Sequence, residues 1–294
     1  MNPTAPVVAG IDFSAPSTAV LRHAVHAAGL RGAPVIIAHV LDRGILNHRI
    51  AGAESGHGIG QITAQAERKL ADLAAHHAEG AKVRIEVRCG RPADELNRLI
   101  EESGAELLVI AANDLTKKRL GSIASRCVRT APCDVMVLRD WQEGDFSKIA
   151  VCSDFSRTAA HALDRGIDLA SAHGASLEII HVMYPPSRDI WGEVLDHESD
   201  APTSYAEECH KQAKESMAAF LKPFTGRLDS IQHEVVILES VIPSLALTHH
   251  FQDTGTDLVV LGTRGVSRIA GFFLGTNAER LLHDAGVSVL AVRD

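Results

Sequence analysis

A glycine-rich segment near the carboxyl end of the chain has residue types that could hold a phosphate. The segment GTRGVSRIAGFFLGT, Gly262 to Thr276, follows an apolar run and combines glycines, hydroxyls and two arginines. Glycines let a backbone approach a ligand closely, and the unpaired amides at the start of a following helix attract anions. The alternative interpretation is a pair of turns flanking a surface loop, which the glycines alone do not exclude.

The spacing of this segment separates it from the common nucleotide motifs. Gly262 and Gly265 enclose two residues, nine more precede Gly275, and Asn277 follows shortly after. This is neither the G-x-G-x-x-G fingerprint nor a Walker loop, because no G-K-[ST] occurs. The segment has arginines, such as Arg264, but no lysine and no Glu or Gln that would position a water for hydrolysis. It therefore predicts phosphate binding rather than rapid turnover.

An internal repeat organises the rest of the chain. Residues 7–14, VVAGIDFS, return as residues 149–156, IAVCSDFS, so Asp12 matches Asp154. Further segments recur in the same order: residues 35–40 with 177–182, 104–110 with 255–261, and 135–139 with 289–293. We therefore expect two similar domains, residues 1–140 and 148–294, joined by a linker at 141–147.

The repeat predicts an α/β architecture. In each half, short runs of β-branched and aliphatic residues alternate with longer Ala-rich segments of helical period, such as 64–76 and 205–221. Strands separated by such helices imply parallel crossovers, so each half should be a doubly wound, Rossmann-like sandwich of about five parallel strands. Ligands bind such sheets at the carboxyl ends of the strands, where strand order reverses. The glycine-rich segment falls at that edge.

Composition narrows the function classes. The chain has 294 residues, a formal net charge of −8 and no basic stripe, which argues against nucleic-acid binding. No apolar stretch approaches the roughly 20 residues of a membrane span, and we expect a cytoplasmic protein without a membrane partner. The five cysteines include no C-x-x-C pair, so reduced thiols are expected rather than disulfides or zinc ligands.

The combined motifs resemble the ATP-binding subclass of the universal stress protein family, in its tandem two-domain form. The resemblance rests on G-x-x-G, nine residues and G-[ST] after the fourth strand, together with strand-Asp-x-Ser and a His-Val pair ending the second strand. It covers residues 145–294, and a weaker version extends over 1–140. It implies a nucleotide-dependent stress-response or regulatory protein with ATP and Mg²⁺ as ligands.

Carried over by position, the resemblance assigns a site in the second half. Asp154 would lie near the ribose and Mg²⁺, while the backbone at Cys152 and Ser153 and the side chain of Val182 would flank adenine. The residues implied are Cys152, Ser153, Asp154, Val182, Gly262, Thr263, Arg264, Gly265, Gly275, Thr276 and Asn277. No catalytic residue is implied. The alternative role for Asp154 is a helix N-cap, which is compatible with ligand binding.

The first half departs from this pattern. Ala111 and Asp114 stand where the second half has its first two glycines, and only six residues separate Asp114 from Gly121. A carboxylate at that position would repel a triphosphate, so the first half is interpreted as degenerate for ATP. At another place the first half is closer to the family pattern, with Gly90-Arg-Pro-Ala where the second half has Val241-Ile-Pro-Ser. The second half therefore departs from the family pattern at the adenine end of its site.

Two further expectations concern the histidines at the strand ends and the closing strands of the two halves. His39 and His181 recur at matching strand ends, where a structural hydrogen bond is expected rather than proton transfer. The closing strands 135–139 and 289–293 should pair and make the two halves a pseudo-dimer, because unpaired edges are a liability; whether the whole chain also forms a homodimer is open. The alternatives to a nucleotide-dependent regulator are a slow ATPase and a ligand-free interaction scaffold.

Overall fold

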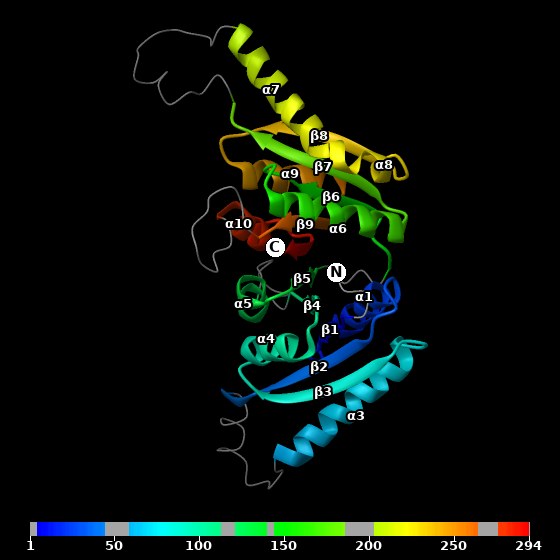
Figure 1. Cartoon of the computed structure of the whole chain (residues 1–294). Coiled ribbons are helices and arrows are strands. Elements are labelled where there is room, and N and C mark those ends of the chain that lie inside the picture. The colour runs from blue at the N-terminus through cyan, green and yellow to red at the C-terminus, as the bar shows by residue number, and fades with distance from the viewer. Residues whose placement is uncertain are drawn as a thin grey trace. The chain divides into compact units, whose positions relative to one another are not determined.

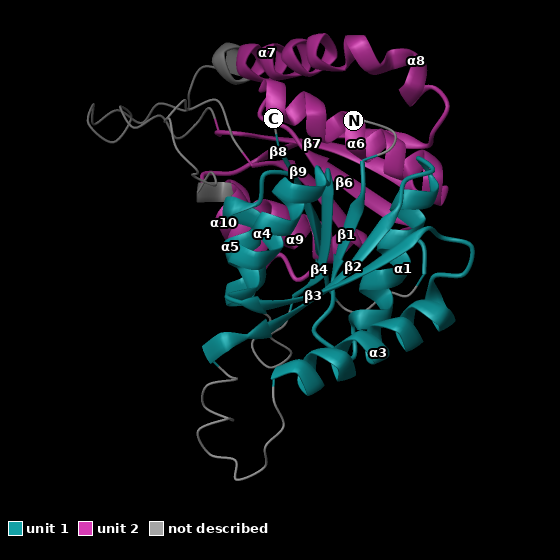
Figure 2. Cartoon of the chain, turned by 60° about the horizontal axis from the view of Figure 1, so that its bottom comes forward, with its two compact units in different colours: residues 1–145, 288–293 teal, residues 146–287, 294 magenta. Residues whose placement is uncertain are grey.

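Strands and helices alternate along most of the described chain (Figure 1). The computed structural model describes residues 5–44, 59–112, 121–139, 144–185, 203–263 and 276–293. The chain divides into two compact units, drawn in different colours in Figure 2. The first unit comprises residues 1–145 together with 288–293, and the second comprises residues 146–287 and residue 294.

The first unit is built on a sheet with the strand order β3-β2-β1-β4-β5-β10. Strands β1 to β5 pair in parallel. Helices α1 and α3 lie on one face of the sheet and helices α4 and α5 on the other (Figure 2). The bounds are β1 Val7–Gly10, α1 Ser17–Gly29, β2 Val35–Asp42, α3 Ile59–His77, β3 Val83–Gly90, α4 Pro92–Ser103, β4 Leu107–Ala111, α5 Ser122–Thr130, β5 Asp134–Leu138 and β10 Ser288–Val292.

The second unit repeats this plan with the strand order β9-β6-β7-β8, all parallel. Helices α6 and α7 lie on one face of this sheet and α9 and α10 on the other (Figure 1). The bounds are β6 Lys148–Cys152, α6 Arg157–His173, β7 Ser176–Met183, α7 Thr203–Leu221, the 3₁₀ helix η1 Lys222–Phe224, α8 Thr225–Leu228, β8 His233–Glu239, α9 Pro243–Thr254, β9 Leu258–Gly262 and α10 Thr276–Asp284.

Local sequence explains where the matching helices α4 and α9 begin and end. Each begins with proline in its first turn, at Pro92 and Pro243, where the missing N–H costs no helical hydrogen bond. Each ends at a glycine in the left-handed conformation, Gly104 with φ 65° and Gly255 with φ 68°.

The central strands are buried on both faces, as the continuous apolar runs predict. In the first unit Val8 and Leu108 have no exposed surface, and in the second unit neither Val151 nor Val260 has any. In both sheets the strand order reverses beside the first strand, between β1 and β4 and between β6 and β9. The fold class predicted from the sequence, alternating α/β with parallel sheets, is confirmed.

Strand β10, from the carboxyl end of the chain, completes the sheet of the first unit. It runs antiparallel to β5, with Val289 opposite Val137. The Arg293 amide donates to Asp134 Oδ1 at 2.8 Å, and the Arg139 amide donates to Ser288 Oγ at 3.0 Å. The pairing of the closing strands is therefore present, whereas the wider arrangement of the halves as a pseudo-dimer stays a prediction.

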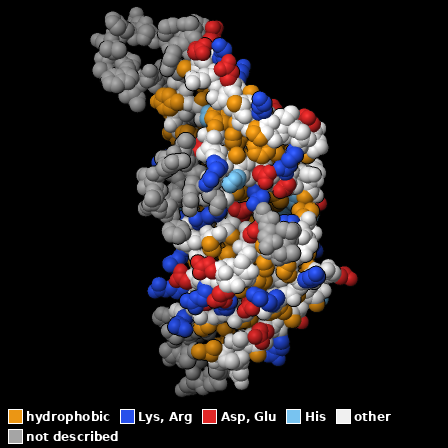
Figure 3. Space-filling view, in the orientation of Figure 1, with side chains coloured by type: hydrophobic (Ala, Val, Ile, Leu, Met, Phe, Trp, Pro, Cys, Tyr) orange, Lys and Arg blue, Asp and Glu red, His pale blue; other side chains and the backbone are white. Residues whose placement is uncertain are grey.

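None of the described helices is long and apolar enough to cross a membrane. Figure 3 shows one face of the molecule, on which acidic and basic side chains are interspersed rather than gathered by sign.

Candidate functional site

The turn between β6 and α6 carries the central residues of the predicted site. β6 lies between β7 and β9, so its carboxyl end stands where the strand order reverses. The Ser153 amide donates to the Ile180 carbonyl at 2.8 Å, and the Phe155 amide donates to Ser153 Oγ at 3.1 Å. These bonds fix the backbone directly before the exposed carboxylate of Asp154.

Asp154 does not cap helix α6. The N-cap is Ser156, whose Oγ accepts from the Ala159 amide at 3.1 Å, and the helix begins at Arg157. Asp154 Oδ1 instead accepts from the Ser156 amide at 3.0 Å, an Asx turn that precedes the helix. The proposed N-cap role is therefore wrong by two residues, because a Ser two positions later competes for it. The carboxylate remains exposed to solvent beside the start of a helix.

The same turn holds a phenylalanine in an unusual conformation. Phe155 has φ 62°, a left-handed value that costs roughly 1–2 kcal/mol for a residue with a Cβ. Its ring stacks on His181, with centroids 4.2 Å apart. His181 Nδ1 donates to the Ser153 carbonyl at 2.9 Å, so the histidine holds both ends of the strained turn.

The first unit repeats this arrangement of a left-handed phenylalanine and a histidine, which we call the clamp. Phe13 has φ 61°, its ring centroid lies 4.5 Å from that of His39, and His39 Nδ1 donates to the Ile11 carbonyl at 2.7 Å. The structural hydrogen bond predicted for both histidines is confirmed. The role of the phenylalanines was missed, although the repeated Asp-Phe-Ser was the available signal.

Gly262, the last residue of β9, has a packing reason to be glycine. A Cβ there would lie 2.8 Å from Thr158 Cγ2 and 3.2 Å from the Thr158 backbone carbonyl carbon. The first turn of α6 thus approaches β9 more closely than any side chain at residue 262 would allow. This brings the amino end of α6, where amides favour anions, to the strand end that leads into the glycine-rich segment.

The structure brings part of the predicted site together. Cys152 ends β6 and is followed by Ser153 and Asp154, and Gly262 ends the neighbouring β9 and is followed by Thr263. Val182 is half-buried in β7, on the other side of β6. Thr276 and Asn277 begin α10. Arg264, Gly265 and Gly275 lie outside the described residues.

The thiol of Cys152 has a raised pKa. Burial raises the pKa of its thiol to about 12, so the thiolate that would react is scarce near pH 7. Burial also raises the pKa of Cys127 to about 12. The five cysteines are all unpaired, as the sequence predicts.

Apolar side chains surround the ends of β7 and β8. Tyr184, Val241 and Ile242 are exposed by 53%, 39% and 44%. The Ser240 amide donates to the Met183 carbonyl at 3.0 Å, which ties the segments after the two strands together. Exposed apolar side chains therefore follow both β7 and β8 at their carboxyl ends.

The first unit has a cavity at the matching place. A space of about 190 Å³ opens at the carboxyl ends of β1 and β4, where the strand order of this unit reverses. It was not predicted. It is lined by Gly10, Ile11, Asp12, Ala38, His39, Val40, Pro92, Leu96, Ile110, Ala111, Gly121, Ser122, Ile123 and Ala124.

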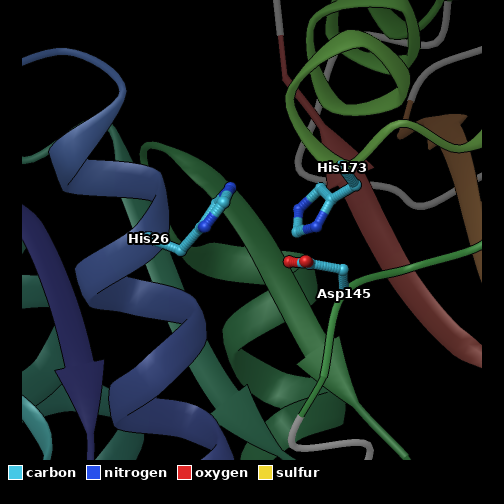
Figure 4. A group of neighbouring side chains, drawn as sticks. All are labelled: His26, Asp145 and His173. Atoms are coloured by element: carbon cyan, nitrogen blue, oxygen red, sulfur yellow. The ribbon is translucent and has the colours of Figure 1, made fainter.

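We assign no metal site to the described histidines. Figure 4 shows His26 on α1, Asp145 before β6 and His173 at the end of α6. His26 and Asp145 belong to the first unit and His173 to the second, so we assign no site to them. Within the second unit, His173 packs edge-on against Phe146, with centroids 5.1 Å apart.

Comparison with known proteins agrees with this architecture. The universal stress protein family matches residues 4–139 and again residues 145–293. Universal stress protein Rv2005c of Mycobacterium tuberculosis is 25% identical over 301 residues, covering 98% of this chain and 96% of the relative. A universal stress protein of Thermus aquaticus is 30% identical over 148 residues, covering 50% of this chain and 99% of the relative.

Solved structures share the fold over the full length. Protein PA1789 of Pseudomonas aeruginosa, described as functionally unknown, has a TM-score of 0.72 at 16% identity and covers 99% of this chain and 92% of its own. A universal stress protein of Archaeoglobus fulgidus has a TM-score of 0.66 at 19% identity, with coverage of 98% and 96%. The chain belongs to the universal stress protein family and contains two tandem domains of it.

Proposed function

We propose that the second unit binds ATP with Mg²⁺ and that the protein is a nucleotide-dependent stress-response protein. One observation carries this proposal. The exposed Asp154 carboxylate and the first turn of α6 lie beside Gly262, the last residue of β9. The place is the switch point of a parallel sheet, where such folds bind ligands. The glycine-rich segment continues from it.

The described residues suit the parts of this ligand. Asp154 offers a carboxylate to ribose hydroxyls or to Mg²⁺, which prefers oxygen ligands. Amides at the starts of α6 and α10 favour phosphates, and the apolar surface at Tyr184 and Val241 suits a purine ring. Bound Mg²⁺ would supply charge neutralisation at the phosphates.

Calorimetry on the full chain with ATP and Mg²⁺ tests the proposal. We expect one ATP per chain, and we expect Gly265→Asp to abolish binding by placing at this position the carboxylate that the first half carries at Asp114. Asp154→Asn should weaken the Mg²⁺ dependence of binding, while Asp12→Asn, the matched change in the first unit, should leave it unaltered. Equal affinity of the wild-type and Gly265→Asp chains would refute this site.

We further propose that ATP is held far better than it is hydrolysed. Hydrolysis needs a group that positions a water, commonly a Glu or Gln. In the described part of the chain, neither residue type adjoins Asp154, Gly262 or Thr263 in sequence. Turnover should lie far below the common range of about 1–10³ per second. A single-turnover assay with radiolabelled ATP and Mg²⁺ measures it, and conversion within seconds that is lost in Asp154→Ala but kept in Cys209→Ala would favour an ATPase.

A further inference from the structure

Strand β8 forms an open edge of the sheet in the second unit. It stands last in the strand order, and among the described strands it pairs with β7 alone (Figure 1). The Gln232 carbonyl accepts from β7 and the Ser240 amide donates to β7. Because the direction of the backbone groups alternates along a strand, the N–H and C=O groups of the odd-numbered residues from 233 to 239 point away from β7. The strand therefore offers a row of donors and acceptors to a further strand.

The side chains of β8 leave the middle of this edge without charge. Natural edge strands are commonly protected from pairing by charged side chains. β8 instead carries an apolar run at residues 235–238, of which Val235 is 40% exposed and the others are half-buried. Its titratable side chains stand at the two ends of the strand, where they are His233, Glu234 and Glu239.

The matching edge strand of the first unit, β3, is charged throughout its middle. Arg84, Glu86 and Arg88 alternate along it, and the Glu86 oxygens lie 3.3 Å from Arg84 Nε and 4.0 Å from Arg88 Nε. The repeat aligns Glu86 with Val236 of β8, because both strands pair with the second strand of their unit in the same register. The two units therefore differ in the protection of the same edge.

One antiparallel register pairs two copies of β8 over their whole length. In this register Val236 lies opposite Val236 of the second copy, and Val235 lies opposite Ile237. At each end His233 lies opposite Glu239. The odd-numbered residues, whose backbone groups point outward, then form the hydrogen-bonded pairs of the ladder. Apolar side chains oppose apolar ones and histidine opposes glutamate, and such cross-strand pairs are stabilising.

The same register is unfavourable for β3. It would place Glu86 opposite Glu86 of a second copy and Arg84 opposite Arg88. Like charges directly opposite one another destabilise a strand pair. Self-pairing is therefore disfavoured at the edge of the first unit and favoured at the edge of the second.

We propose that β8 is a homodimer interface, at which the second unit pairs antiparallel with β8 of a second copy of this chain. The second copy is the matching occupant because this strand is complementary to itself in apolar side chains, in charge and in the direction of its backbone groups. Pairing joins the sheets of the two second units into one continuous sheet. This goes beyond the ATP site proposed above, because it involves other residues and is measured without nucleotide.

Sedimentation velocity of the full chain, from low micromolar to high micromolar concentration, tests the proposal. We expect a species of about twice 31.4 kDa whose share rises with concentration. Val236→Glu gives β8 the residue that β3 has at this position, so the fold accommodates it, and it should weaken association at least tenfold by bringing two carboxylates together. Glu86→Gln is the matched control in β3 and should leave association unaltered. A monomeric wild type, or unchanged association in Val236→Glu, would overturn the proposal.

A mixture of two variants tests the register. Val236→Lys alone should also weaken association at least tenfold, because two ammonium groups meet at the centre of the interface. When Val236→Glu and Val236→Lys chains are mixed, opposite charges face one another, and we expect association at least tenfold stronger than that of either variant. A mixture that stays monomeric would refute the interface, because the proposed register places residue 236 opposite itself.

Cross-linking keeps the test open where a charged variant does not fold. Residues opposite one another in a non-hydrogen-bonded antiparallel pair have Cα atoms about 4.5 Å apart, within the range of a disulfide. On mild oxidation Val236→Cys should form a disulfide-linked dimer. Val235→Cys is more exposed but does not face itself, so it should cross-link at least tenfold more slowly, with the wild type as background for the native cysteines. Equal rates for the two variants would contradict the proposed pairing.

Discussion

The two units have different residue types at one buried position of their matching folds: a glutamate in the second unit and an isoleucine in the first. In the second unit Glu178 on β7 is 5% exposed and accepts from Lys148 Nζ at 2.8 Å and from His250 Nε2 at 3.0 Å. In the first unit the repeat puts Pro6, Ile36 and Leu99 at these positions, and Ile36 and Leu99 are buried. The first unit has apolar residues where the second unit holds a polar triad of Lys148, Glu178 and His250.

Local hydrogen bonds support this correspondence. Ser103 Oγ donates to the Leu99 carbonyl at 2.6 Å, and Thr254 Oγ1 donates to the His250 carbonyl at 2.8 Å, so α4 and α9 match turn by turn. Since the first unit folds around Ile36, the fold does not require the triad. A buried charge that loses its partners is nonetheless costly, so Glu178 and its partners depend on one another.

The largest expected effect is that of Glu178→Ile, which introduces the residue of the first unit. It leaves Lys148 and His250 without their shared carboxylate and should cost about 3 kcal/mol, at the low end for a broken buried pair because the Lys148 side chain is 25% exposed and can reach water. Hydrogen exchange resolved by peptide should place the loss in β6, β7 and α9, with the first unit unaltered.

The triple variant Lys148→Met, Glu178→Ile and His250→Leu is the control for this prediction. With all three side chains replaced by apolar ones, the free energy of unfolding should return to that of the wild type or exceed it. A triple variant as unstable as Glu178→Ile would mean that the triad, rather than an orphaned charge, stabilises the second unit.

The next effect compares Gly262 with Ala111, which end matching strands. Gly262→Ala should cost about 1–3 kcal/mol, because its Cβ would meet the Thr158 backbone, which cannot move aside like a side-chain end. Ala111→Gly should cost only about 0.5–1 kcal/mol, through chain entropy. Thermal unfolding of the ligand-free chain measures both, and equal losses would contradict the close approach of α6.

The sequence predicted the fold well because the repeat is visible in it. Matching runs around residues 7–14 and 149–156 located the strands and their carboxyl ends, which suffices to bring Asp154 and Gly262 together. The cavity could not be predicted in the same way, because it depends on how Gly10 packs against Ile110. Glu178 within an apolar strand was a signal that was overlooked, whereas its partners Lys148 and His250 come together only through tertiary packing.

A smaller effect tests whether the strained turns are equivalent. His39→Ala and His181→Ala each remove a hydrogen bond to a backbone carbonyl and a ring in contact with a left-handed phenylalanine. Each should cost about 1–2 kcal/mol, because one modest hydrogen bond and one aromatic contact are lost. Hydrogen exchange at residues 11–17 and 153–159 would report them separately. A loss confined to one unit would show that the clamp matters only there.

The smallest expected effect concerns the side chain that packs against the phenylalanine of each clamp. In the first unit the Lys69 ammonium lies 5.4 Å from the Phe13 ring centroid, whereas in the second unit Phe220 lies 5.7 Å from Phe155. Lys69→Met keeps an apolar stem and removes the cation, so it should cost about 0.5–1 kcal/mol. Lys69→Phe copies the second unit and should recover that loss, because an aromatic pair contributes about 0.5–1.5 kcal/mol. Chemical denaturation of both variants tests this. If Lys69→Phe is no more stable than Lys69→Met, the cover of Phe13 contributes through its charge and not through an aromatic contact.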